Sequence, residues 1–413
     1  MLANVSLPGG RIADLTIEGG IVVHAGAARP ADQVIDCGGK LCIPAGIDLH
    51  VHMRGRGERG KEDWASGTRA ALAGGVTLVV DQPNTVPPIA TPAELEARIG
   101  EARRDAVCHF AVNGALTAES DLEGLWRGGA ALFGEGFLAP STHGIAIGED
   151  QLPALLARVA KLGATASIHA EEVQALADTN PLEHALARPA SGEARTVSRA
   201  AAAADATGCR LHFCHLSTAE GIAAARGRGT IEATPHHLLL SFEAFLECGG
   251  RGKVNPPLRS EEDRRALFRC WNAIDVIASD HAPHQSAEKD APWESAPAGL
   301  PGTETMLPLL VVEYLRGSID HSSLVAKTST NPARILGIEP PGLGVGDRAD
   351  IAVFPRESTR ISAEMLHSKA GWTPYEGRDA VFPEIVCMAG ECVYRDGEFL
   401  PGQPVFVPGK GLL

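Results

Sequence analysis

The chain has 413 residues, of which 44% are hydrophobic, and its 51 acidic residues outnumber its 37 basic residues, giving a formal net charge of −14. This length exceeds one ordinary domain and suits a barrel of about 250 residues with an accessory domain. The lysines and arginines are scattered along the chain, so the sequence gives no electrostatic support for binding nucleic acid or an anionic membrane surface.

The sequence predicts a cytoplasmic protein. No stretch approaches the roughly 18 consecutive apolar residues of a membrane span, and the first residues lack the basic region followed by an apolar region that marks a signal peptide. The nine cysteines are odd in number and include no Cys-x-x-Cys pair, which favours reduced thiols in a reducing compartment. We interpret the cysteines as small core residues.

The first and last parts of the chain both predict short strands. Residues 1–45 contain β-type runs separated by Gly-Gly turns, at Ile12–Ile17 and Ile21–His24, and residues 346–413 contain similar runs. We predict that these two terminal parts pair into one small β domain. Residues 46–345 then form the larger domain.

Short strands alternate with helices within residues 46–345. The β-type runs predict eight strands, which cover Ile47–His52, Val76–Asp81, Val107–Val112, Ala131–Glu135, Thr165–His169, Arg210–Cys214, Gly229–Ala233 and Ile274–Ser279. Helical periodicity predicts helices over Glu62–Ala73, Pro92–Arg104, Gln151–Leu162, Ala194–Ala206, Glu261–Trp271 and Glu304–Leu315. Strand-helix alternation requires parallel strands with right-handed crossovers, so we predict an α/β fold, a TIM-type (β/α)8 barrel. A doubly wound open sheet is the alternative.

Two motifs that follow apolar strands carry metal-binding residue types. The first strand ends in Asp48-Leu-His-Val-His-Met-Arg54, and the last ends in Ser279-Asp-His-Ala-Pro-His284. Because side chains alternate along a strand, His50 and His52 point to one face, and neutral imidazoles suit Zn²⁺ or a similar ion. A single histidine is usually a core or surface residue, but this repeated placement favours a metal site.

The metal-competent residues of several strands should meet at one rim of the barrel. Those at or just beyond the C-terminal ends of predicted strands are His50, His52, Glu135, His169, His215 and Asp280. Barrel enzymes hold their active sites at this rim. The sequence therefore predicts a metal-dependent hydrolase.

Further motifs resemble those of the dihydroorotases within the amidohydrolase superfamily. Besides the two motifs above, they are Lys61-Glu-Asp-Trp-Ala-Ser-Gly-Thr68, Gly74-Gly-Val-Thr77, Gln82-Pro-Asn-Thr-Val-Pro-Pro88, His169-Ala-Glu-Glu172, Cys214-His-Leu-Ser-Thr218, Pro235-His-His-Leu238, Asn255-Pro-Pro-Leu-Arg259 and Asn331-Pro-Ala-Arg334. The resemblance runs from about residue 40 to Gly377. It implies a barrel with two zinc ions that interconverts N-carbamoyl-L-aspartate and L-dihydroorotate in de novo pyrimidine (UMP) biosynthesis.

The resemblance also implies roles for the candidate ligands. One metal would be held by His50, His52 and Asp280, and the other by His169 and His215. Asp280 would in addition carry the proton between the attacking water and the ring nitrogen; a helix N-cap is the alternative interpretation of this residue.

The ligand that bridges the two metals departs from the family pattern. Many relatives use a carboxylated lysine at the end of the fourth strand, but residues 131–138 contain no lysine. Alignment of the Phe-Leu pair puts Glu135 at that position, where its shorter reach would pull the backbone inward or change the metal separation. A helix-capping or surface glutamate is the alternative, and Glu149 and Asp150 are weaker candidates for the bridge.

The resemblance assigns the substrate carboxylate to Arg54, whose planar guanidinium can bind it in a bidentate manner. Asn84 and His284 would lie beside it, and Asn255 would contact the ring. A surface arginine, an Asx-turn asparagine and a loop histidine are the ordinary alternatives.

The loop that follows Arg54 also departs from the family pattern. Relatives commonly continue with Asp-Pro-Gly, whereas this chain has the glycine-rich segment Gly55–Gly60. Arg56 and Arg59 are therefore competitors for the substrate carboxylate. For three further histidines, His143, His236 and His237, we expect structural or indirect roles.

Two other classes of function stay open at this point. One is a related cyclic amidohydrolase, such as a hydantoinase, dihydropyrimidinase or allantoinase, whose substrates lack the carboxylate. The other is a non-catalytic homologue that associates with aspartate transcarbamoylase, although such chains typically lose metal ligands and this one keeps them. The family expectation for the assembly is a homodimer.

Overall fold

Eight parallel strands close into a barrel in the computed structural model, which describes residues 1–139, 146–148 and 150–410. The strands are β6 (Gly46–Val51), β7 (Val76–Asp81), β8 (His109–Val112), β9 (Phe133–Phe137), β10 (Thr165–His169), β11 (Arg210–Phe213), β12 (Thr230–Ala233) and β13 (Val276–Ile277). They form two parallel arcs, β6-β7-β8 and β9 to β13 in chain order. Parallel bridges from Gly114 to Phe133 and from Val51 to His281 join the two arcs. The predicted (β/α)8 barrel is confirmed, and the open sheet is excluded.

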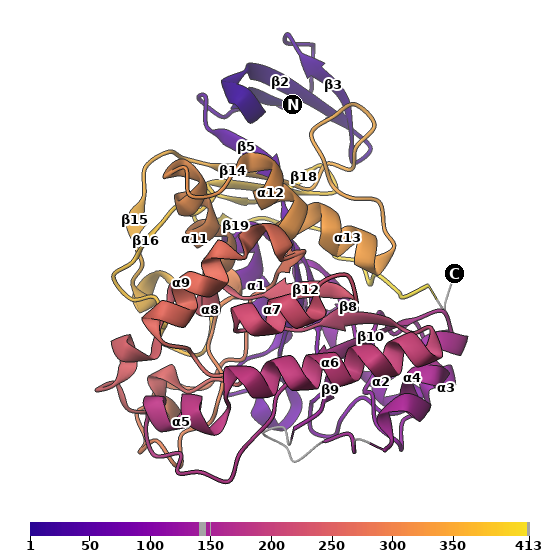
Figure 1. The fold of residues 1–413 in the computed structure, drawn as a ribbon. Coiled ribbons are helices and arrows are strands. Elements are labelled where there is room, and N and C mark those ends of the chain that lie inside the picture. Colours follow the sequence, from indigo (N-terminus) through magenta and orange to yellow (C-terminus); the bar gives the residue numbers. More distant parts are fainter. Residues whose placement is uncertain (140–145, 149, 411–413) are drawn as a thin grey trace.

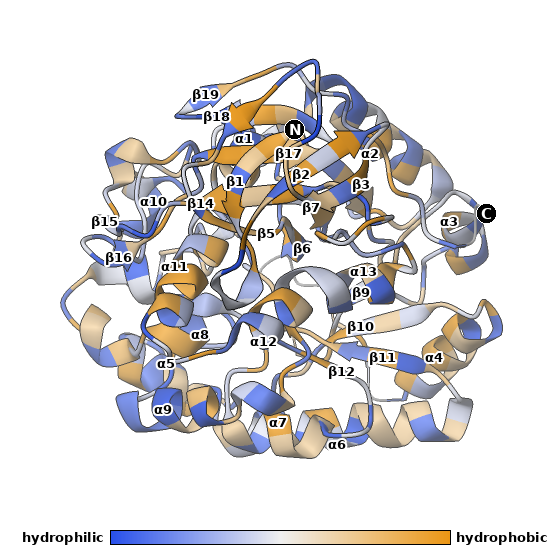
Figure 2. Cartoon of the chain, turned by 90° about the horizontal axis from the view of Figure 1, so that it is seen from above, coloured by the Kyte–Doolittle hydropathy of each residue, from blue (hydrophilic) through white to orange (hydrophobic). Residues whose placement is uncertain are grey.

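The helices surround this barrel. They are α1 (Trp64–Ala73), α2 (Pro92–Asp105), α3 (Leu122–Arg127), α4 (Leu152–Lys161), α5 (Pro181–Ala187), α6 (Ala190–Thr207), α7 (Ala219–Ala225), α8 (Pro235–Leu239), α9 (Glu261–Arg269), α10 (Ser286–Lys289), α11 (Thr303–Leu315), α12 (His321–Val325) and α13 (Asn331–Leu336). Hydrophilic and hydrophobic residues alternate along α6 and α9 at the periphery (Figure 2). This pattern lets one face of each helix pack on the barrel.

The six predicted helices form where the sequence supplies capping residues at the helix ends and an apolar face along the helix. At the start of α2, the Thr91 side chain and Glu94 complete a reciprocal capping box. At the end of α6, Gly208 adopts the left-handed conformation, with φ 70°. Helices such as α8 and α12 were missed because five residues are too few to show a helical period.

A nine-stranded sheet lies beside the barrel and contains both terminal parts of the chain (Figure 1). Its strands are β1 (Leu2–Ser6), β2 (Ile12–Glu18), β3 (Ile21–Gly26), β4 (Ile35–Asp36), β5 (Leu41–Pro44), β14 (Ile351–Phe354), β17 (Ile385–Met388), β18 (Glu391–Arg395) and β19 (Glu398–Phe399). The terminal parts meet where β5 pairs with β14 in antiparallel register. The predicted β domain built from both termini is therefore present.

The C-terminal part also packs on the barrel. Phe354 belongs to the same apolar cluster as barrel residues, and Trp372 and Tyr375 are buried against Leu309 of α11. A short two-stranded ladder, β15 (Thr359–Arg360) with β16 (Asp379–Ala380), lies in this segment. The division of the chain into residues 46–345 and the two terminal parts stays a prediction.

Two expectations about composition can be compared with the structure. Among the described residues, no helix combines the length and the apolar character needed to cross a membrane. Six of the nine cysteines are buried, as a core role requires, but Cys248 is exposed and Cys270 and Cys392 are partly exposed. The interpretation of every cysteine as a core residue was therefore wrong for these three.

Candidate metal centre and active site

The six predicted metal ligands converge at the C-terminal rim of the barrel. His50 lies in β6 and His52 just after it, and the remaining four lie in or just beyond β9, β10, β11 and β13. All six side chains are buried, with at most 8% of any residue exposed. The order of the strands around the barrel thus brings together residues up to 230 positions apart in the chain.

Glu135 lies at the centre of this cluster, and its two carboxylate oxygens face different neighbours. Oε1 is 2.7 Å from His169 Nδ1 and 2.7 Å from His215 Nε2. Oε2 is 3.5 Å from His50 Nε2 and 3.9 Å from His52 Nε2. One carboxylate therefore contacts both groups of candidate ligands.

Asp280 completes the group around the first two histidines. Its Oδ1 atom is 3.2 Å from His52 Nε2 and 3.5 Å from His50 Nε2. His50, His52 and Asp280 offer ligand atoms that all lie within 4.8 Å of one another, as do His50, Glu135 and His215. Asp280 does not cap a helix, because α10 begins only at Ser286.

A bulge in β9 positions the Glu135 side chain. Phe133 pairs with Ala166 of β10 and Gly136 pairs with Ile168. A step of three residues along β9 therefore matches a step of two along β10, which means that β9 contains one extra residue. Gly134 has a φ of 132°, and a Cβ atom there would lie 2.1 Å from the Ser167 carbonyl oxygen. Bulges re-aim side chains within a sheet, and this one is consistent with the inward shift expected for a shorter bridging residue.

The charges of the cluster are strongly coupled. Burial alone would lower the pKa of His50, but the carboxylates of Glu135, Glu232 and Asp280 outweigh it and raise this pKa well above its usual range. Burial alone would raise the pKa of Glu135, yet the neighbouring imidazoles hold it well below its usual range. The buried carboxylates thus depend on nearby positive charge, which imidazolium groups or a cation can supply.

The same residues fit a divalent metal ion. The buried His50 Nε2 and His215 Nδ1 atoms have no hydrogen-bond partner within the described part of the chain, and His50 Nε2 points at the carboxylates of Glu135 and Asp280. Imidazole nitrogens with carboxylate oxygens are the donor set of Zn²⁺ and similar ions. The cluster is therefore a candidate metal-binding site.

Two carboxylates that the sequence analysis missed hold the imidazoles in place. Glu232 in β12 lies 3.1 Å from His50 Nδ1 and accepts a hydrogen bond from the backbone N–H of His215. Glu171 Oε2 lies 3.0 Å from His169 Nε2. Such partners fix the orientation of metal-binding histidines. A glutamate within an otherwise apolar strand was the available signal for Glu232, because an unpaired buried charge is costly.

The four predicted substrate residues, Arg54, Asn84, Asn255 and His284, all line one cavity of about 100 Å³ that borders the metal-competent cluster. His284 Nε2 lies 3.0 Å from the Ala298 carbonyl oxygen and 3.2 Å from Arg54 Nη2. The Oδ1 atoms of Asn84 and Asn255 and the Nδ1 atom of His284 are buried and have no hydrogen-bond partner among the described residues. Burial and the charge of Arg54 lower the pKa of His284 to about 2, so this imidazole is neutral.

The competing arginines do not line this cavity. Arg56 Nε lies 3.1 Å from Glu101, and Arg59 is exposed. Among the described residues that line the cavity, Lys61 is a second cation besides Arg54. The sequence analysis missed Lys61 and the other lining residues Phe137, Val254, Ala282 and 297–299. Lys61 lies 2.8 Å from Glu58.

The remaining candidates have structural surroundings or lie outside the described residues. His237 is held between Thr234 Oγ1 and the Pro256 carbonyl, and burial lowers the pKa of its neighbour His236 to about 4. Asp150 is exposed, so it does not suit the role of a buried ligand that bridges two metal ions. His143 and Glu149 lie outside the described residues.

A buried ion pair fixes the backbone of Arg54, which has a positive φ of 43°. Arg98 Nη1 donates to the Arg54 carbonyl at 2.8 Å, and its Nε atom donates to Asp81 Oδ2 at 2.8 Å. The other oxygen of Asp81 accepts the Met53 N–H. The start of the loop after β6 is thus tied to α2.

A (β/α)8 barrel with imidazoles and carboxylates gathered at its rim is the arrangement of a metal-dependent hydrolase. The amidohydrolase family model matches residues 41–373. The chain therefore belongs to the amidohydrolase family and is a metal-dependent hydrolase that acts on cyclic amides, and its relatives include proteins named dihydroorotase. The protein of Methanosarcina acetivorans is 40% identical over 97% of this chain and 93% of its own length, and that of Halobacterium salinarum is 38% identical over 96% and 97%.

The solved structures that resemble this chain include hydantoinases. L-hydantoinase (dihydropyrimidinase) from Arthrobacter aurescens has a TM-score of 0.92 and 25% identity, covering 98% of this chain and 99% of its own. D-hydantoinase from a Thermus species has a TM-score of 0.87 at 24% identity and covers 100% and 99%. The latter shows the common fold alone.

Replacement of Arg98 tests the role of the buried ion pair. Arg98→Met leaves Asp81 buried without its cation, so we expect the free energy of unfolding to fall by about 3–5 kcal/mol. Urea unfolding measures this loss. Arg104→Met, an exposed position on the same helix, should change the free energy by less than about 0.5 kcal/mol. Equal stability of the two variants would contradict the role of Arg98.

Proposed function

We propose that this protein is a dihydroorotase that reversibly cyclises N-carbamoyl-L-aspartate to L-dihydroorotate, with release of water, in de novo pyrimidine biosynthesis. The observation that carries the proposal is the shared cavity, where a metal-competent cluster borders a buried arginine. The ring substrate has an amide to be cleaved and a carboxylate to be recognised. The metal-competent cluster would act on the amide, and the buried arginine would bind the carboxylate.

Two zinc ions per chain are part of the proposal. His50, His52 and Asp280 would hold one, and His169 and His215 the other, with Glu135 shared between them because its oxygens face both groups. When bound, such ions polarise the amide carbonyl and lower the pKa of water toward neutrality. Imidazole and carboxylate donors support zinc, and the two faces of Glu135 support two ions.

Asp280 is proposed as the residue that moves the proton. Burial would raise its pKa, but His50, His52 and His215 lower it, so Asp280 is a carboxylate at neutral pH and can accept a proton. In ring opening it would take the proton of the attacking water and deliver it to the leaving ring nitrogen. In ring closure the same transfers run in reverse.

Arg54 is proposed to bind the carboxylate that the ring carries. It is a buried guanidinium at the cavity wall, and a planar fork binds carboxylates in a bidentate manner. The neutral His284 and the amides of Asn84 and Asn255 would complete the polar contacts.

The same features weigh against the alternatives. Hydantoinases, dihydropyrimidinases and allantoinases act on rings without this carboxylate, so a buried arginine beside the cluster would have no partner in their substrates. A non-catalytic homologue would not need the metal ligands, whereas this chain keeps all six candidate residues buried at one rim of the barrel. We retain a cytoplasmic homodimer and an association with aspartate transcarbamoylase as parts of the proposal that rest on the family alone.

Replacement of Asp280 tests the proton transfer. We expect Asp280→Ala to lower kcat by about 10²–10⁴-fold, which is the usual contribution of a general acid-base group. The thermal unfolding transition should persist in this variant. Assays with carbamoyl-aspartate and with dihydroorotate should lose rate together. Asp205→Ala, an exposed position on α6, serves as the control. Near-normal turnover in Asp280→Ala would refute the assignment.

Replacement of Arg54 tests substrate recognition. A charge-assisted hydrogen bond contributes about 1.5–3 kcal/mol, so we expect Arg54→Met to raise KM for carbamoyl-aspartate by roughly 10- to 150-fold with a smaller effect on kcat. Hydrolysis of hydantoin or dihydrouracil, which lack the carboxylate, should not worsen. Arg56→Met is the matched control within the same loop. An unchanged KM in Arg54→Met would move the carboxylate site elsewhere.

Metal analysis tests the shared ligand. We expect one to two zinc ions per chain in protein purified without chelators, and a clear decrease in bound zinc in Glu135→Ala. Exhaustive chelation should abolish activity, and added Zn²⁺ should restore it. Substantially less than one metal ion per wild-type chain, with activity retained, would contradict the proposed centre.

A further inference from the structure

A pair of cysteines lies on the hairpin formed by β17 and β18. Cys387 and Cys392 are register partners across these antiparallel strands, and the Cys392 Sγ atom lies 3.6 Å from the Tyr394 carbonyl oxygen. Directly opposite residues in an antiparallel pair have Cα atoms about 4.5–5.5 Å apart, which is within the range of about 4.4–6.8 Å found in disulfides. The backbone is therefore already suited to a bond between them.

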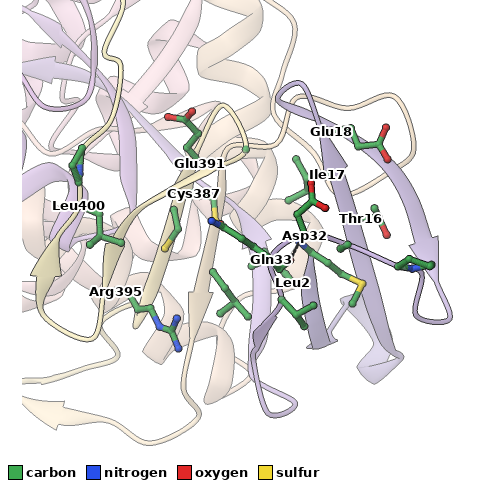
Figure 3. Close-up of a pocket in the computed structure, with 18 residues that line it drawn as sticks. Leu2, Thr16, Ile17, Glu18, Asp32, Gln33, Cys387, Glu391, Arg395 and Leu400 are labelled. Atoms are coloured by element: carbon green, nitrogen blue, oxygen red, sulfur yellow. Dashed lines mark hydrogen bonds between the residues drawn. The ribbon is translucent and has the colours of Figure 1, made fainter.

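Both cysteines line a cleft of about 1110 Å³ in the nine-stranded sheet. Figure 3 shows Cys387 and Arg395 on one side of this cleft and Thr16, Ile17 and Glu18 of β2 on the other. Cys392 is partly exposed, whereas Cys387 is buried. A small molecule that enters the cleft therefore meets Cys392 first. Among the described residues, those lining this cleft are separate from those lining the active-site cavity.

The surroundings make the two thiols chemically different. The neighbouring Cys387 thiol favours the thiolate of Cys392 and outweighs its burial, so that the pKa of Cys392 is lowered to about 7, with a further contribution from Arg395. The neighbouring Cys392 and burial raise the pKa of Cys387. A partly exposed thiolate beside a second thiol is the arrangement of redox-sensitive cysteine pairs.

We propose that Cys392 and Cys387 form a reversible thiol-modification site whose reactant is a small disulfide such as oxidised glutathione. The Cys392 thiolate attacks one sulfur of the disulfide, forming a mixed disulfide and releasing one thiolate. Cys387 then attacks the Cys392 sulfur, forming the Cys387–Cys392 bond. The glutathione thiolate leaves and takes up the proton that Cys387 loses. The two cysteines are oxidised, and the small disulfide is reduced to two thiols.

The neighbouring thiols act as internal comparisons. Cys37 and Cys42 lie in the same apolar cluster as Cys387, but burial raises the pKa of both, so neither is expected to react. Cys248 is exposed on a separate segment and reports whether the reagent reaches an ordinary surface thiol. The site therefore predicts a specific pattern of modification across these five cysteines.

The test is peptide mapping by mass spectrometry of the full chain after incubation with oxidised glutathione. We expect a Cys387–Cys392 disulfide in the wild-type protein, and its loss on addition of dithiothreitol. Cys387→Ser should stop the reaction at a glutathione adduct on Cys392. Cys392→Ser should give neither product at this hairpin. Cys248→Ser is the matched control and should leave the disulfide unchanged.

Two outcomes would overturn the proposal. If Cys248 is glutathionylated while Cys387 and Cys392 both stay reduced in the wild-type protein, the pair is not reactive. If the wild-type protein accumulates a stable adduct on Cys392, then Cys387 does not resolve it. Both outcomes are read from the wild-type chain, so they do not depend on the folding of a variant. Neither readout uses enzyme activity, so failure of this proposal is distinct from failure of the proposed function.

Discussion

The arrangement of the candidate active site depends on one buried carboxylate with two different sets of neighbours. Glu135 faces His169 and His215 with one oxygen and His50 and His52 with the other. A buried carboxylate is stable only when positive charge and hydrogen-bond donors compensate its desolvation. In this chain the compensation comes from residues in or just beyond three other strands, β6, β10 and β11, so the same interaction that stabilises the charge also assembles the site.

The barrel supplies the positions, and local irregularities supply the final geometry. Strand alternation and barrel closure put the ligands on one rim, which any barrel of this family can do. The bulge at Gly134 and Glu135, and the ion pair of Arg98 with Asp81 that holds the Arg54 backbone, are particular to local sequence. Function here resides in these side chains rather than in the fold, since hydantoinases share the fold closely.

Much of the fold could be predicted from the sequence because its signals are periodic. Apolar runs separated by amphipathic segments located all eight barrel strands, and the i, i+2 spacing of His50 and His52 indicated a shared face. The bulge at Glu135 could not be predicted, because it depends on the packing of Gly134 against the Ser167 carbonyl. Lys61 and Glu171 were missed for a similar reason. Their contacts depend on how separate segments pack together in the tertiary structure, which the hydrophobic pattern of the sequence does not specify. The distinction between Cys392 and the buried cysteines likewise requires the tertiary structure.

The central claim is that Glu135 serves two cations in the place of a carboxylated lysine. Anomalous diffraction from crystals of the zinc-loaded protein, recorded at the zinc absorption edge, tests this most directly. The account predicts two peaks, one beside His50 and His52 and one beside His169 and His215, with one oxygen of Glu135 directed at each. A single peak, or a Glu135 side chain directed away from both positions, would contradict it.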